Sequence, residues 1–318
     1  MTRHRSRRRS GPRRAGRRPA LILVLLTVTA CSQGGERQPA QEPRTQAQAS
    51  TSTSVPATTV IAGQQVSLKE VESIEGAVRK YFDAFFSADF KGLATHSTGE
   101  LKVLAGWQRI LNGESTGLGA LKPAAATVED LKVVSVTGDA ATVEIKGQLD
   151  ETASVIEGNR GEDRLLSTSI DGAVKLVRGT TWQVADFHRG GRWARGQIYT
   201  KVRDQQSGQG VVVKVVGVDL RPKGTVVMME LRNTTGLEAG AGGTVVRDAS
   251  GRRLQIALGR DLVVVQVKGR SKATTGLFYM SALRPTTRSF NYLVDVNLGC
   301  NQVCKVGTSM DIPVRLLG

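Results

Sequence analysis

The sequence predicts two folded domains: an α+β domain in which helices pack on an antiparallel sheet, and then an all-β sandwich. Apolar residues recur at helical spacing over residues 68–89. From residue 128 onward the spacing changes to two, which is typical of half-buried strands. After about residue 208 no helical pattern occurs, and short apolar runs alternate with Gly, Asn and Pro turns. Helices followed by a run of strands indicate an α+β domain.

The first 30 residues have the pattern of an export signal. Residues 1–20 carry nine arginines and no acidic residue, and residues 21–30 are an apolar run. A membrane-spanning helix needs about 20 apolar residues, so this run is too short to be a stable anchor. Positive charge followed by a short apolar core predicts a signal peptide over residues 1–30.

The signal ends in Val28-Thr29-Ala30-Cys31, which resembles the bacterial lipobox. The resemblance implies that Cys31 is lipidated and becomes the mature N-terminus, so the protein is anchored in the cell membrane on its extracytoplasmic face. The alternative is an ordinary secretory signal in which Cys31 is incidental. Arginine pairs leave the twin-arginine export route open, and the Arg-, Ala- and Gly-rich composition resembles that of actinobacterial proteins.

Residues 31–67 are rich in Gln, Pro, Ser, Thr and Ala, and their apolar residues show no period. Such a composition buries too little apolar surface to offset the entropy of ordering, so we expect a disordered tether. Its acidic and basic residues cancel. The tether would hold the folded domains clear of the membrane.

Charge is distributed unevenly over the 318 residues. The net charge is +16 for the whole chain, −2 for residues 68–200 and +9 for residues 201–318. This distribution excludes a uniformly basic nucleic-acid coat protein, and the single long apolar run excludes a protein with many membrane spans. Basic residues gather in three predicted turns, at 252–253, 268–272 and 284–288. They predict contact with an anionic partner, phospholipid or wall polymer, and the alternative is that they only maintain solubility. Nucleic acid is not expected as a partner in this compartment.

In the α+β domain the strongest element is a helix over residues 68–89, with Ser67 as N-cap and Glu70 completing a capping box. A second helix is expected over residues 100–111, ended by Asn112-Gly113. Gly-containing turns separate the expected strands, and the segment 169–174 predicts a type I′ hairpin around Asp171-Gly172. The expected strands are 131–133, 141–145, 165–170, 174–177 and 182–184.

The order of these elements over residues 68–200 resembles the nuclear-transport-factor-two-like domain, a cone of helices on a curved sheet (SnoaL-type, cystatin-like). The resemblance rests on aromatic pairs in the first helix, 81–82 and 85–86, on the Ala88-Asp89 step, and on the W-x-V strand at 182–184. Enzymes of that family place acids, bases and histidines inside the cone. The corresponding candidates for a pocket in this chain are His96, Glu144, Trp182, Asp186 and His188.

Residues 208–318 predict the sandwich, with about seven strands at 211–218, 225–231, 244–246, 262–267, 274–280, 290–296 and 312–316. The run 226–233 followed by Thr234-Thr235 and the D-x-x-G turn at 248–251 resemble immunoglobulin-like domains of bacterial lipoproteins. Glycines 240–243 are expected to form a flexible loop. The RGGR segment 189–192 is interpreted as a loop at the end of the first domain.

Chemistry-bearing motifs are few. Asp186 and His188, two apart on a strand, could act in proton transfer, but a strand end near solvent is the simpler interpretation. The sequence has no nucleophile motif, phosphate-binding loop or zinc ligand set, so no cofactor and no metal are expected. Cys300 and Cys304 are expected to form a structural disulfide, because paired cysteines oxidise outside the membrane.

Together these observations predict a membrane-anchored extracytoplasmic lipoprotein that acts as a non-enzymatic binding or scaffolding module of the cell envelope, with an envelope protein as a further partner. A small-molecule carrier or sensor, or a proton-transfer enzyme, remains as an alternative. A side-chain-filled cone would favour the scaffold. A deep apolar pocket with convergent polar groups would favour the binder, and an acid–base pair at its base the enzyme.

Overall fold

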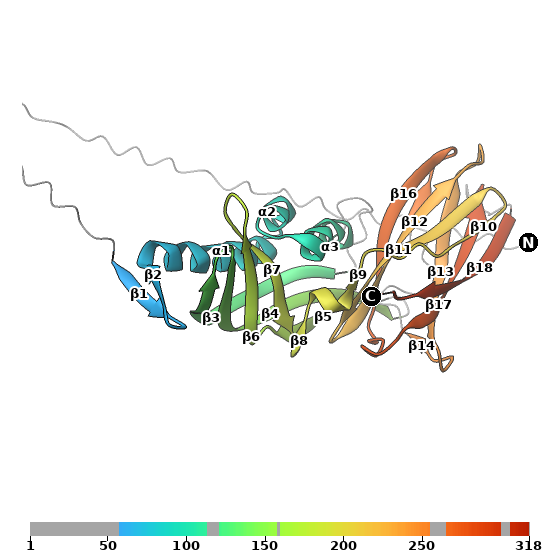
Figure 1. Ribbon diagram of the computed structural model, residues 1–318. Helices are drawn as coiled ribbons and strands as arrows, with labels where there is room; N and C mark the ends of the chain where they lie inside the picture. The colour runs from blue at the N-terminus through green and yellow to red at the C-terminus, as the bar shows by residue number, and fades with distance from the viewer. Residues whose placement is uncertain (1–56, 113–120, 158–159, 255–264, 300–305, 318) are drawn as a thin grey trace, which may run out of the picture. The chain divides into compact units, whose positions relative to one another are not determined.

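The computed structural model describes residues 57–112, 121–157, 160–254, 265–299 and 306–317, all within one compact unit that begins at Ser54. The described chain is mostly β, with antiparallel sheets and few helices (Figure 1), which confirms the β-rich prediction. Cys31, Cys300 and Cys304 lie outside the described residues.

Three helices form one layer: α1 (Leu68–Phe86), α2 (Phe90–Thr95) and α3 (Gly99–Leu111). Ser67 caps α1 as expected, because its hydroxyl accepts the Glu70 N–H at 3.1 Å. The second half of the capping box is wrong. The Glu70 carboxylate binds Arg178 and accepts the Trp182 indole N–H at 2.8 Å, so it joins α1 to the sheet instead. The helix ends three residues earlier than expected, and Ala88 then takes a positive φ of 54°.

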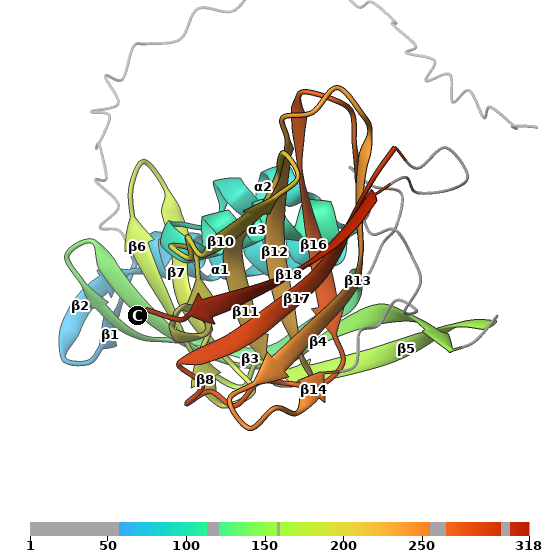
Figure 2. The same cartoon turned by 90° about the vertical axis from the view of Figure 1, so that its right-hand side faces the viewer.

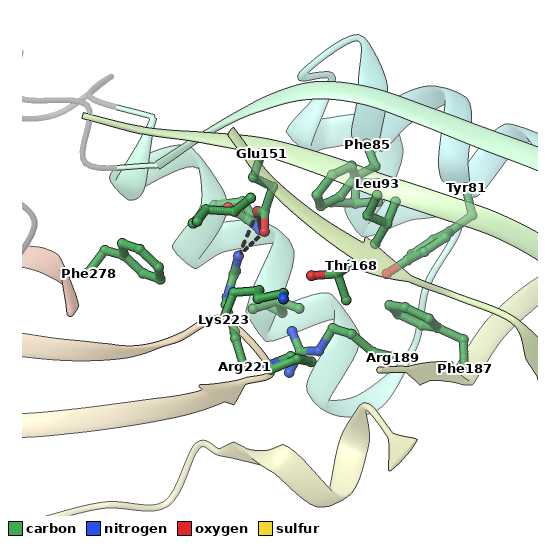
Figure 3. Close-up of a pocket in the computed structure, with 15 residues that line it drawn as sticks. Tyr81, Phe85, Leu93, Glu151, Thr168, Phe187, Arg189, Arg221, Lys223 and Phe278 are labelled. Carbon is green, nitrogen blue, oxygen red and sulfur yellow. Dashed lines mark hydrogen bonds and ion pairs between the residues drawn. The ribbon is translucent and has the colours of Figure 1, made fainter. Parts of the chain in front are cut away.

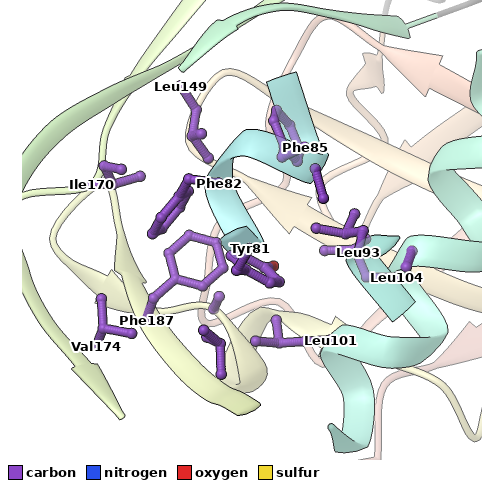
Figure 4. Packing of buried hydrophobic residues seen from close by; sticks show 14 of the residues in the cluster. Tyr81, Phe82, Phe85, Leu93, Leu101, Leu104, Leu149, Ile170, Val174 and Phe187 are labelled. Atoms are coloured by element: carbon purple, nitrogen blue, oxygen red, sulfur yellow. The ribbon is translucent and has the colours of Figure 1, made fainter. Parts of the chain in front are cut away.

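The helices cover one face of a sheet with strand order β3-β4-β6-β7-β8, in which β5 also pairs with β4 (Figure 1). The strands are β3 (Leu121–Thr137), β4 (Ala140–Glu157), β5 (Arg160–Ser169), β6 (Gly172–Arg178), β7 (Trp182–Arg189) and β8 (Arg192–Trp193). Between helices and sheet lies an aromatic cluster (Figure 4). The Phe82 ring meets those of Tyr81 and Phe187 edge-on, with centroids 5.1 and 5.6 Å apart.

The predicted hairpin at residues 169–174 is wrong. β5 and β6 do not pair with each other; both pair with β4, where Gln148 faces Ser169 and Ile145 faces Gly172. The Asp171 carboxylate accepts the Gly147 N–H at 2.9 Å, and the Ile170 N–H donates to the Gly147 carbonyl. These bonds carry the chain past two positions of β4, residues 146 and 147, so the two strands continue along the same edge in one register.

The predicted tether also ends too late. Residues 58–67 form a hairpin of β1 (Thr58–Ile61) and β2 (Gln64–Ser67), whose turn residues Ala62 and Gly63 both have positive φ. Such a turn matches the twist of a two-residue hairpin. Val66 is buried, which ties β2 to the folded unit. The preceding part of the tether lies outside the described residues.

The second domain contains two antiparallel sheets with a shared core (Figure 2). One sheet contains β9 (Ile198–Tyr199), β10 (Gln205–Gly208), β11 (Val211–Arg221), β12 (Gly224–Asn233) and β16 (Ser271–Tyr279). The other contains β13 (Ala239–Asp248), β14 (Arg253–Leu254), β15 (Val265–Val267), β17 (Ser289–Leu298) and β18 (Val306–Arg315).

Two boundaries of the second domain differ from the sequence expectation. Its first sheet begins at β9 rather than near residue 208, because Tyr199 and Ile198 pair with Val218 and Asp219 of β11. The glycines 240–243 are not a loop. They lie in β13, where Gly240 faces Asn297 of β17, and a register shift between Gly242 and Val245 accommodates them.

The two domains share a packed boundary. Strand β12 is buried on both faces: Val226 and Met228 join the core of the α+β domain, while Val227 and Met229 join the core of the second domain. Helix α3 covers the outer face of this sheet, with Trp107 lying over Gly217 of β11. Because successive side chains of a strand point to opposite faces, this one sheet contributes side chains to both cores.

Replacing Gly217 with alanine is expected to lower the free energy of unfolding by about 1–3 kcal/mol, because a Cβ at this position would overlap the Trp107 ring. Gly236→Ala is the matched control, since an added Cβ there meets no atom within 4 Å. Urea denaturation measures both. Equal stability of the two variants would show that the boundary is not tightly packed.

Candidate functional site

A cavity of about 20 Å³ lies where the α+β domain meets the β11–β12 hairpin (Figure 3). Aromatic and aliphatic side chains line most of it, including Tyr81, Phe85, Phe187 and Phe278. This volume is about that of a single water molecule. This cavity therefore has room for about one water molecule.

Glu151, Arg189 and Arg221 line the cavity and form, together with Asp219, a chain of four buried charges. Arg221 binds Glu151 with Nη1 2.5–2.6 Å from both carboxylate oxygens, and its Nε donates to Asp219 at 2.7 Å. Arg189 completes the chain with Nη2 2.5 Å from the Asp219 carboxylate. Each of these side chains is at most 10% exposed. Two carboxylates and two guanidiniums make the ion chain neutral as a whole.

Four positions far apart in the sequence build this ion chain. Glu151 comes from β4 and Arg189 from the end of β7, while Asp219 and Arg221 both come from β11. Asp219 and Arg221 are two residues apart on one strand, so their side chains share a face. The Arg189 backbone is held by the β7–β8 hairpin, whose turn residues Gly190 and Gly191 have positive φ. The segment interpreted from sequence as a terminal loop is therefore a tight turn that positions Arg189.

Asp219 and Arg221 remain charged at neutral pH. Burial raises the pKa of the Asp219 carboxyl, but the charges and hydrogen bonds of Arg189 and Arg221 outweigh this and leave that pKa below its usual value. Burial lowers the pKa of Arg221, yet Glu151 and Asp219 raise it above the ordinary arginine value. Burial also raises the pKa of the nearby Tyr81, which keeps its hydroxyl protonated.

Three buried polar atoms near the cavity have no hydrogen-bond partner among the described residues: Gln108 Oε1, Arg189 Nε and Arg221 Nη2. The other end of the Gln108 amide donates to Glu151 at 3.2 Å. Buried polar atoms are costly when unpaired, and a water molecule needs two to four such partners. The cavity therefore suits a water molecule or a small polar group.

The Asp–His pair predicted from the sequence does not reach this cavity. Phe187 and Arg189 line it, so Asp186 and His188, at the alternate positions of β7, face the other side of the sheet. The Asp186 carboxylate accepts the N–H groups of Phe187 and Arg195, both at 2.9 Å. The His188 ring packs on Trp193, with centroids 4.2 Å apart. Both side chains contribute to the local structure around β8.

The other three pocket candidates lie elsewhere as well. His96 caps the C-terminus of α2, and Glu144 is exposed on β4. Trp182 is buried but bonds Glu70 of α1. None of the five candidates lines this cavity.

Sequence reasoning missed all four members of the ion chain. One signal was present: Asp219 and Arg221 place two opposite charges on one face of the apolar strand 211–221. Charged residues at core-facing positions are rarely left unpaired. Glu151 carries no comparable signal in the sequence.

Among the described residues no cluster of three or more metal-ligating side chains occurs. Within the same residues no helix has both the length and the hydropathy to cross a bilayer. No known family model matches the chain, and no curated protein matches it.

Proposed function

We propose that this protein is a lipid-anchored, extracytoplasmic module of the cell envelope that acts as a non-enzymatic scaffold. The observation that carries the proposal is the small volume, about 20 Å³, of the cavity between the α+β domain and the β11–β12 hairpin. A protein that carries a small-molecule ligand needs a pocket of several hundred Å³, and an enzyme needs side chains that are free to react. Here three of the four charged side chains that line the cavity, Glu151, Arg189 and Arg221, are held in buried ion pairs.

We further propose the finer fold assignments. Three helices on one face of an antiparallel sheet, with α1 aromatics packed against β7, support a nuclear-transport-factor-two-like cone for the first domain. Two antiparallel sheets around one core support an immunoglobulin-like sandwich for the second. The shared boundary at β12 makes the two domains one scaffold rather than two independently moving units.

The anchor is proposed from the lipobox at residues 28–31. Replacing Cys31 with serine is expected to abolish incorporation of labelled palmitate and to move the protein from the membrane fraction to the medium or to an unprocessed form. The physical reason is that the thioether-linked lipid supplies most of the membrane affinity. Labelling and fractionation in the producing cell measure both effects.

Ser32→Ala is the matched control for the anchor, because it changes the neighbouring residue and leaves the acceptor thiol in place. It is expected to label and fractionate like the unmodified protein. Equal labelling of the Cys31→Ser protein and its parent would refute the lipid anchor.

A small-molecule binder remains the second candidate, favoured by the three unpartnered polar atoms of the cavity. They are two donors and one acceptor at the end of an apolar interior, which is the pattern of an amphipathic ligand site. Binding of such a ligand would require the β11–β12 hairpin at Pro222 and Lys223 to move, since these residues line the cavity. The scaffold is preferred because the closed arrangement pairs the charges without a ligand.

A further inference from the structure

A second concave site lies far from the ion chain, at the end of the sandwich where β12 finishes and β16 begins. Its walls are Arg232, Asn233 and Thr234 of the first segment and Arg270, Ser271 and Lys272 of the second. We call these six residues the basic cleft. Its volume is about 350 Å³, much larger than that of the cavity near Arg221.

The charge of the basic cleft is unbalanced. Arg232 and Lys272 are direct cross-strand partners, an arrangement in which like charges repel each other. Lys272 is compensated by Glu230, with Nζ 3.4 Å from the carboxylate. Within the described part of the chain, Arg232 and Arg270 have no carboxylate within ion-pair distance. Two exposed guanidiniums therefore face one concavity without counter-charge.

The backbone of the cleft is held rigidly. The buried Asn233 side chain donates to the Leu237 carbonyl at 2.6 Å and accepts the Thr235 N–H at 2.9 Å. Arg270 adopts a positive φ of 56°, a conformation that costs energy for a residue with a side chain. Its N–H donates to the Thr235 carbonyl at 2.9 Å, which joins the two walls. The backbone that bears the three cations is thus fixed before any ligand arrives.

The hydroxyl groups of the cleft already donate to the protein. Thr234 Oγ1 donates to the Gly210 carbonyl at 2.6 Å, and Ser271 Oγ donates to the Lys268 carbonyl at 2.7 Å. A ligand would therefore be recognised by the guanidinium and ammonium groups. Guanidinium groups bind phosphate oxygens through two parallel N–H bonds, which makes a phosphate group the best match.

We propose that the basic cleft binds the phosphate of an anionic phospholipid headgroup. The choice of lipid rests on the proposed function: an anchor at Cys31 places a bilayer within reach. A flexible chain of 26 residues, the number from 31 to 56, would span about 25–31 Å on average. Tethering at this range raises the effective concentration of headgroups at the cleft. The cleft would then orient the sandwich on the membrane.

The test uses the mature chain, residues 31–318, carrying Cys31→Ser so that no lipid contributes to binding. Vesicles of phosphatidylcholine with about one-third phosphatidylglycerol are compared with pure phosphatidylcholine at low salt by sedimentation. The cleft variant is Arg232→Gln/Arg270→Gln. The control, Arg203→Gln/Arg315→Gln, removes the same charge from two exposed arginines of this domain that lie outside its basic clusters. Circular dichroism verifies that each variant folds.

We expect the parent to bind only the anionic vesicles and the cleft variant to bind about 30-fold more weakly, while the control changes by less than about threefold. If vesicle binding weakened equally in both variants, the proposal would be overturned, because the attraction to the membrane would then depend on net charge and not on the cleft. It would also be overturned if the parent ignored the vesicles, or if it bound only inorganic phosphate or anionic wall polymer. The vesicle experiment uses a chain without the lipid on Cys31, so a negative result does not affect the palmitate test of the anchor. The cleft proposal and the anchor proposal can therefore be refuted independently.

Discussion

Replacing Arg221 with methionine is expected to lower the free energy of unfolding by about 3–5 kcal/mol. Arg221 is the only member of the ion chain that binds two carboxylates among the described residues, those of Glu151 and Asp219. The substitution keeps the aliphatic part of the side chain but leaves the buried Glu151 carboxylate without its cation. Guanidinium chloride denaturation of the purified protein measures the loss.

Two further variants separate the ion chain from general effects of losing an arginine. Arg315→Met removes an exposed arginine from β18 and is expected to change stability by less than about 0.5 kcal/mol. Combining Glu151→Gln with Arg221→Met removes both charges of one pair and leaves the Asp219–Arg189 pair intact. The double variant should lose about 0.5–3 kcal/mol less unfolding free energy than the two single variants lose in sum. Strict additivity would show that the pair does not interact.

Replacing Phe82 with alanine is expected to cost about 3–5 kcal/mol, because its ring is 1% exposed and packs edge-on against Tyr81 and Phe187. The loss would combine the transfer of the ring to water with a new cavity at the centre of the cluster in Figure 4. The same denaturation experiment measures it.

Phe86→Ala is the matched control, since Phe86 lies on the same helix and is 52% exposed. We expect a change of less than about 0.5 kcal/mol. A comparable loss for both variants would mean that the ring of Phe82 does not fill the interior, and the basis for preferring a scaffold would be lost.

Local pattern predicted the helical layer well. The 3.6-residue period of 68–89 places Ile74, Val78 and Phe82 on one face, and these side chains are buried against the sheet. Helix α3 and its end at Asn112 follow from the same kind of signal. The short helix α2 was missed because its six residues contain too few turns for a period to show.

Non-local pairing could not be predicted from the sequence. A Gly preceded by Asp at 171–172 usually marks a hairpin, but here β4 is long enough to pair with both flanking strands, and Asp171 binds Gly147 instead. The ion chain also depends on contacts between residues that are distant in the sequence. Glu151 and Arg221 are 70 residues apart, and only the packing of the two domains brings them together.

The pocket candidates failed for a related reason. Asp186 and His188 were chosen by residue type and by their shared face, and the shared face is real. Which face of β7 meets the helices depends on Phe187 and Arg189, the first packing on the aromatic cluster and the second pairing with Asp219 of the other domain. The sequence does not show that a charged residue faces inward unless its ion-pair partner is also known.

The central claim, an anchored scaffold whose cavity at the β11–β12 hairpin has a small volume, is tested most directly by the intact mass of the mature protein purified from its producing cell. The mass is measured under native and then under denaturing conditions. We expect residues 31–318 plus the lipid on Cys31 in both, with no further mass under native conditions except that of a phospholipid bound at the basic cleft. An additional stoichiometric mass that is not a phospholipid, present under native conditions and lost on denaturation, would contradict the scaffold and establish a bound small molecule.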